Sequence, residues 1–271
     1  MNNTKKKSPI SWVPTAYFAM GLPFVVLNMV TVLMFKGLEV DDKLITFWTS
    51  LILLPWTLKP LWSPFLELFR TKKFFVIVTQ LITGVTFGLV AFALNLSHFF
   101  SISIALLAIV AFSGATHDIA CDGVYMSELS NEDQAKFIGW QGAFYNIAKI
   151  LATGGLVYLA GYFIELNADA GLLTANKRAW MIILLILSVT MILLGIYHLF
   201  ALPSTQSASS RKTLRSNKEV MKELGQVLMD FFSKTHITYY ICFIILYRFA
   251  EGFVMKIVPL FLKADREMGG L

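Results

Sequence analysis

Charged side chains lie inside stretches of this chain that are otherwise long and apolar. They are Lys59, Asp118, Asp122, Lys149, Arg248, Glu251 and Lys256. Burying a charge in hydrocarbon costs several kcal/mol, about 2.5–3.5 on insertion scales. A chain keeps such residues where they face a cavity or pair with one another. The pattern therefore indicates a route for something polar through a bilayer.

Asp118 and Asp122 are four residues apart, which places both carboxylates on one face of a helix. Two close carboxylates in a low-dielectric site resist double ionisation, so we expect one of them to hold a proton. A proton-coupled transporter needs such a group. The alternative is that one Asp is structural while the other lies near cytoplasmic water. His117 lies about 100° around the helix from Asp118, where it either extends a proton path or is simply hydrogen-bonded.

A polar stripe follows in the next apolar stretch. Gln141, Tyr145 and Lys149 recur at every fourth position, as one wall of a water-lined cavity requires. We expect Lys149 to pair with Asp118 or Asp122, because an unpaired buried Lys tends to lose its proton. Alternatively, Lys149 binds an anionic substrate.

Two further basic positions have both a structural and a functional interpretation. Arg248 and Glu251 lie one helical turn apart, either as an internal ion pair or as a site where the planar Arg binds a carboxylate or phosphate. Lys59 lies among prolines that should bend its helix. It either reaches the central cavity or extends toward the membrane surface.

The composition places these residues in a polytopic α-helical membrane protein. The 271 residues are 56% hydrophobic and only 15% charged, with a mean hydropathy of +0.66, whereas soluble domains are about 25% charged. The apolar runs are continuous, which excludes the alternating pattern of a membrane β-barrel. The net charge of +6 comes from Lys and Arg residues that cluster in loops, as in membrane proteins. It therefore does not indicate nucleic-acid binding. The two cysteines lack metal-binding spacing, and we expect no cofactor.

Several stretches are long enough to cross the hydrocarbon core, which takes about 20 residues. They are 12–35, 44–68, 73–96, 98–127, 137–165, 179–202 and 236–262. Lys and Arg are concentrated before the first stretch and in every second loop after it. This bias predicts a cytoplasmic N-terminus.

The stretches predict three parts of the chain. Residues 1–202 form a half with six spans, 203–235 a cytoplasmic linker, and 236–271 the first span of an incomplete second half. Within the linker, Ser216 and Glu219 form a capping box before an amphipathic helix. That helix lies on the inner membrane surface or packs on neighbouring helix ends.

This organisation resembles the major facilitator superfamily, which has two six-span halves and a central site between them. The resemblance implies that the chain is truncated and does not transport alone; a natural seven-span protein is the alternative. Glu67 and Arg70 lie where the superfamily keeps its gating motif between spans two and three.

Two motifs narrow the resemblance. Residues 58–64, LKPLWSP, resemble the LKxLWAP stretch of the AmpG-type muropeptide permeases and related acetyl-CoA transporters, and residues 116–122, THDIACD, resemble their TQDIAxDA stretch. The first and seventh spans are also similar. The family implies proton-driven import, in its bacterial branch of anhydro-muropeptides across the inner membrane. Asp118 and Asp122 then match its acidic positions, and Lys59 and Arg248 its basic ones.

Three departures bear on the substrate. His117 replaces the family's Gln, Glu67 its Asp and Gly123 its Ala. A sugar or oligosaccharide permease therefore remains open.

Other classes of function are disfavoured by what the sequence lacks. An integral membrane enzyme would need a nucleophile with its base, or a metal motif. No HExxH, GxSxG or Gly-rich phosphate loop is present, so we predict no enzymatic activity. A receptor with seven spans would place its N-terminus outside, against the charge bias.

Overall fold

The computed structural model describes residues 7–59, 62–63, 66, 71–203, 222, 225–226, 229–230 and 232–262. Within 237–262 it describes the side chains of only some residues. The chain forms two compact units, Met1–Thr205 and Gln206–Leu271. All regular elements in the described residues are helical.

Long apolar helices dominate the first unit. The first of these runs over Pro9–Gly37 and comprises η1 (Pro9–Ser11), α1 (Val13–Val25), the π-helical turn η2 (Val26–Val30) and α2 (Thr31–Gly37). It is followed by α6 (Lys72–Ala93) and α7 (Phe99–Glu128).

The remaining long helices complete this unit. A continuous helical stretch is built from α8 (Asn131–Ile150), the π-helical turn η4 (Leu151–Leu156) and α9 (Val157–Leu166). After the short η5 (Ala168–Ala170) comes α10 (Leu172–Ala201). In the described part of the chain, 5 helices are long and apolar enough to cross a membrane. They coincide with the predicted stretches 12–35, 73–96, 98–127, 137–165 and 179–202, and the chain is a multi-pass membrane protein.

Polar residues in the loops start these helices. The Thr71 hydroxyl accepts from the backbone N–H of Phe74 at the start of α6, and Ser130 does the same for Asp133 at the start of α8. These side chains satisfy N–H groups that have no partner inside the helix. The sequence therefore places helix starts at the ends of the apolar stretches.

The predicted second span is not one continuous helix. The structure has α3 (Asp42–Leu51) and α4 (Leu54–Leu58) with a break at Ile52 and Leu53. Pro55 explains the break, because a proline has no N–H to donate and its ring clashes with the carbonyl four residues earlier. That carbonyl belongs to Leu51, the last residue of α3. The prediction of a bend was sound, but the prediction of a single helix was wrong.

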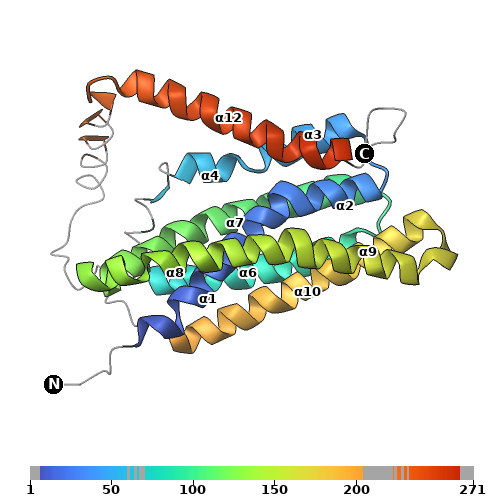
Figure 1. Ribbon diagram of the computed structural model, residues 1–271, viewed down its shortest axis with the longest axis horizontal. Helices are drawn as coiled ribbons and strands as arrows, with labels where there is room; N and C mark the ends of the chain where they lie inside the picture. Colours follow the sequence, from blue (N-terminus) through green and yellow to red (C-terminus); the bar gives the residue numbers. More distant parts are fainter. Residues whose placement is uncertain are drawn as a thin grey trace. The chain divides into compact units, whose positions relative to one another are not determined.

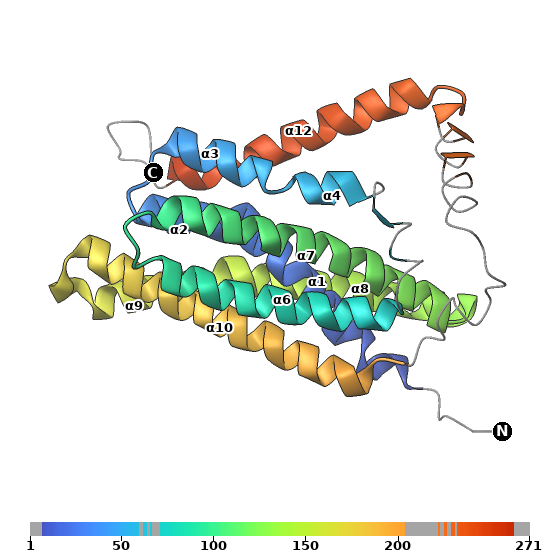
Figure 2. The ribbon, with the colours of Figure 1, turned by 180° about the vertical axis from the view of Figure 1, so that it is seen from behind.

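The helices of the first unit run side by side. Figure 2 shows α6 between α7 and α10, and α6 packs against both. Figure 1 shows α8 alongside α1, with which it packs closely. Gly21 permits this approach, since a Cβ at that position would lie 2.8 Å from the Tyr145 carbonyl oxygen.

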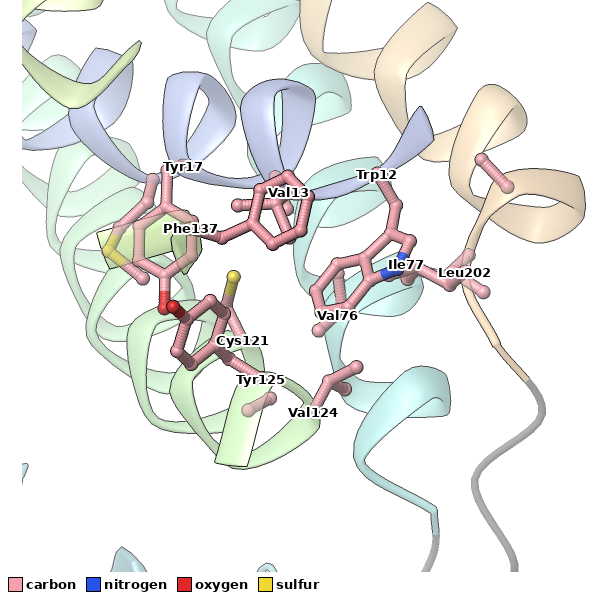
Figure 3. Packing of buried hydrophobic residues seen from close by; sticks show 14 residues of the cluster. Trp12, Val13, Tyr17, Val76, Ile77, Cys121, Val124, Tyr125, Phe137 and Leu202 are labelled. Atoms are coloured by element: carbon pink, nitrogen blue, oxygen red, sulfur yellow. The ribbon is translucent and has the colours of Figure 1, made fainter. Parts of the chain in front are cut away.

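An aromatic core cluster joins one end of these helices (Figure 3). Trp12 and Tyr17 come from the first helix, and Tyr125 from α7. The ring of Tyr125 meets the edges of both, with centroid distances of 6.5 Å to Trp12 and 5.9 Å to Tyr17. Such edge-to-face pairs add to the burial energy of the rings. The cluster therefore anchors Tyr17, whose hydroxyl belongs to the site below.

The second unit contains α12 (Ile237–Leu262), a helix of 26 residues that matches the predicted stretch 236–262. The predicted amphipathic helix after Ser216 falls almost wholly outside the described residues.

Candidate functional site

Asp118 is a carboxylate buried between helices, with 7% of the residue exposed. Its Oδ2 accepts from the Lys59 ammonium at 2.6 Å and from the Trp56 indole N–H at 2.9 Å. Its Oδ1 is buried and has no hydrogen-bond partner among the described residues. One oxygen is therefore fully engaged while the other is open.

The break between α3 and α4 brings these partners to Asp118. Trp56 lies in α4 and Lys59 directly after it. The indole lies against α7 at Gly114, where a Cβ would come within 2.9 Å of the Trp56 ring. Phe24 of α1 lies beside this indole, with the two rings edge to face and their centroids 5.3 Å apart. A glycine and an aromatic neighbour thus set the direction of the indole N–H.

Asp122 lies one turn further along the same helix and has a different environment. It is exposed, and its Oδ1 accepts from the Tyr17 hydroxyl at 2.8 Å. The Gln141 amide in turn donates to the Tyr17 oxygen at 2.7 Å. Tyr17 therefore links α1, α7 and α8 through one hydroxyl.

Lys149 does not pair with either carboxylate. Its ammonium lies over the Tyr145 ring, 5.0 Å from the centroid, and Lys59 takes the place predicted for it beside Asp118. The reason is tertiary: α4 approaches α7 next to Asp118, whereas α8 meets α1. The predicted pairing of Lys149 with Asp118 or Asp122 was wrong.

An aromatic row connects the two lysines. The Tyr145 ring lies 6.5 Å from Phe24 and Phe24 lies 5.3 Å from Trp56. Lys149 stands at one end of this row and Lys59 beside the other. Gln141 and Tyr145 thus lie on the side of α8 that meets α1, and the Lys149 ammonium lies over the Tyr145 ring.

A second polar chain runs through the packed core. The Thr15 hydroxyl lies 2.9 Å from His198 Nε2, His198 Nδ1 lies 2.9 Å from the Gln80 amide oxygen, and the Gln80 amide nitrogen lies 3.0 Å from His117 Nε2. His117 is therefore hydrogen-bonded, as one of its two interpretations held. Gln80 and His198 were not predicted from the sequence. A polar side chain inside a predicted span is the signal that could have identified each of them.

Other predicted residues lie beyond this geometry. Glu67 and Arg70 fall outside the described residues. Arg248 and Glu251 lie in α12, in a part of it where only the backbone is described. Their roles stay predictions.

The site combines groups that can exchange a proton and bind an anion. Asp118 has an open oxygen and a cation beside it. The Lys149 ammonium lies over an aromatic ring and forms no ion pair with a described residue. No cluster of three or more His, Cys, Asp or Glu suited to a metal ion occurs among the described residues.

Comparison with known proteins adds no family to this description. No protein-family model matches the chain, and no curated protein matches it either.

Proposed function

We propose that this chain belongs to a proton-coupled secondary transporter of the major facilitator superfamily. It would import a polar solute across the inner membrane, with its N-terminus in the cytoplasm. The observation that carries the proposal is the Lys59–Asp118 ion pair, held at 2.6 Å among helices long and apolar enough to cross a membrane. Burying such charges in hydrocarbon costs several kcal/mol, so their presence there indicates a role in transport.

The pair supports a simple coupling step. A proton that attaches to the open Oδ1 of Asp118 removes the negative charge without first breaking a hydrogen bond. The attraction that holds Lys59 then falls, because two unit charges this close interact strongly in a low-dielectric site. The Lys59 ammonium becomes available to an anionic group of the solute.

The same step runs in the other direction. When a solute anion holds Lys59, Asp118 loses its counter-charge and binds a proton more tightly. Each ligand therefore strengthens the binding of the other, as linkage requires. Co-transport of the proton and an anionic solute follows from this reciprocity.

The surroundings of the pair suit a solute with anionic and ring-shaped parts. Lys59 and Lys149 offer cations, and Trp56, Phe24 and Tyr145 form the aromatic row between them. Gln141 adds an amide beside Asp122. The likeness to the muropeptide permeases makes an anhydro-muropeptide the first choice, with a sugar or oligosaccharide as the alternative.

Uptake into membrane vesicles that contain the transporter to which this chain is proposed to belong tests the proposal. A labelled anhydro-muropeptide should accumulate only while a proton gradient is present, and Asp118→Asn should abolish accumulation. Asp169→Asn, at an exposed carboxylate in η5, is the matched control and should leave uptake unchanged. Accumulation that continues after the proton gradient is collapsed would contradict proton coupling. Accumulation of a labelled disaccharide but not of the muropeptide would keep the coupling and change the substrate class.

A further inference from the structure

The chain of Thr15, His198, Gln80 and His117 connects four membrane helices through uncharged groups. Gln80 and His198 are fully buried, and 3% of His117 is exposed. The chain ends at His117 Nδ1, which is buried and has no hydrogen-bond partner among the described residues. This nitrogen is therefore a buried polar atom without a described partner, on the residue that precedes Asp118 in the sequence.

The Gln80 amide makes the two imidazoles interdependent. An amide offers a donor on one side and an acceptor on the other, so one imidazole must donate to it and the other must accept. A half-turn of the amide reverses both roles, together with the tautomer of each His. The chain therefore has two neutral arrangements. The structure has the first of them, with the amide nitrogen at His117 and the amide oxygen at His198. Because the second differs only by a half-turn of the amide, hydrogen-bond energies decide between them.

In the first arrangement His117 Nε2 accepts from Gln80. His117 then carries its proton on Nδ1, where it has no acceptor. His198 donates from Nδ1 to Gln80, and its Nε2 accepts from the Thr15 hydroxyl.

In the second arrangement His117 donates from Nε2 to Gln80, and His198 donates from Nε2 to the Thr15 oxygen. The Thr15 hydroxyl is then free to donate to the Trp12 carbonyl, 3.2 Å away. This arrangement has one more hydrogen bond and one fewer buried imidazole N–H without a partner. On ordinary hydrogen-bond energies it is favoured by roughly tenfold or more.

We propose that His117 Nδ1 is a second proton-binding atom, and that Thr15, His198 and Gln80 keep it open. In the favoured arrangement Nδ1 presents a bare lone pair, and a proton can bind there while the Nε2–H bond to Gln80 stays intact. In the other arrangement no nitrogen of His117 can take a proton without losing that bond. Thr15, His198 and Gln80 are thus positioning residues, acting from three other helices.

The charged and titratable neighbours of His117 influence how strongly it binds that proton. They are His198 from α10 and Lys59 from the segment after α4. On its own helix, Asp118 is the next residue and Cys121 follows one turn later. For its use in transport the proposal rests on the proton coupling proposed above. The tautomers themselves can be measured without any solute, so the two proposals fail separately.

Nitrogen NMR of ¹⁵N-histidine-labelled protein in lipid bilayers tests the proposal. The chain has 4 histidines, and His98 and His236 are exposed and can be replaced by Asn to simplify the spectrum. Near neutral pH, His117 should be almost entirely the Nε2–H tautomer. Acidification should then add a proton at Nδ1 while the protein stays folded.

The sharpest variant lies on another helix. Thr15→Val leaves each arrangement with one buried imidazole N–H that has no partner, so the two His117 tautomers should become about equally populated, a roughly tenfold shift in their ratio. Thr15→Ser should restore the single tautomer, and Gln80→Met with Thr15→Val should remove any response to residue 15. Thr83→Val is the matched control, because it deletes a different buried hydrogen bond between α6 and α7, that of Thr83 with Ser113.

Three results would overturn the proposal. They are a wild-type His117 in the Nδ1–H form, a His117 tautomer that ignores Thr15→Val, and a His117 that stays neutral on acidification until the protein unfolds.

Discussion

At the scale of single residues, two carboxylates one turn apart have opposite surroundings. Asp118 is buried with a lysine and an indole on one oxygen, and Asp122 is exposed with a tyrosine hydroxyl. Losing a partner therefore has different consequences at the two positions. Water can replace the tyrosine at Asp122, but nothing replaces Lys59 at Asp118.

Lys59→Met should destabilise the protein by about 2–3 kcal/mol, because it leaves a buried charge unpaired. The value lies below the usual range of about 3–5 kcal/mol, since the Lys59 side chain is 27% exposed. Adding Asp118→Asn should recover most of the loss, because the unpaired charge is then gone. Thermal unfolding in detergent measures both. Lys149→Met is the control with little expected effect, and a loss equal to that of Lys59→Met would restore Lys149 as the partner of an Asp.

Tyr17→Phe should cost only about 1 kcal/mol, although it deletes the hydroxyl that joins Asp122 to Gln141. Both partners are at least partly exposed and can bind water instead, so no full desolvation penalty remains. The same unfolding measurement compares it with Tyr158→Phe, whose ring is 76% exposed. A loss as large as that of Lys59→Met would show that Asp122, too, depends on a buried partner.

At the scale of elements, the apolar stretches determine the helices but not which helix faces which. The bounds of α6, α7 and α12 follow from runs of hydrophobic residues, and hydropathy alone predicted them to within a few residues. The choice of Lys59 over Lys149 as the Asp118 partner depends on the path of α4 beside α7, which no periodicity in the sequence encodes. The link between His117 and His198 escapes prediction for the same reason.

Gly114→Ala tests how α4 is positioned against α7. A Cβ would lie 2.9 Å from the Trp56 ring, and such overpacking costs about 1–3 kcal/mol, more than the helix propensity gained. After the roughly 1 kcal/mol that Ala gains over Gly in a helix, we expect net destabilisation of up to about 2 kcal/mol. We also expect a shifted Trp56 fluorescence as the indole leaves Asp118.

Gly161→Ala in α9 is the matched helical control. A Cβ there has no described atom within 4 Å, so the better helix propensity of Ala should leave the protein equally stable or up to about 1 kcal/mol more stable. If Gly114→Ala behaved like Gly161→Ala, the indole would not depend on that close approach.

At the scale of the whole molecule, a multi-pass arrangement of apolar helices positions an ion pair, an aromatic row and a neutral polar chain within one unit. The sequence predicted the membrane class and the acidic pair on α7. It did not predict that the break in the second span helps to form the site. The proline that breaks this span also places Trp56 and Lys59 beside Asp118, so the irregular helix and the site have one cause.

Asp118 is expected to take up a proton together with the solute. The most direct measurement is the external pH of lightly buffered, de-energised vesicles, recorded as an anhydro-muropeptide is added. The vesicles contain the transporter to which this chain is proposed to belong. We predict a rise in external pH as solute and protons enter together, and no rise with Asp118→Asn. Entry of the labelled solute into wild-type vesicles with no change in external pH would contradict the account.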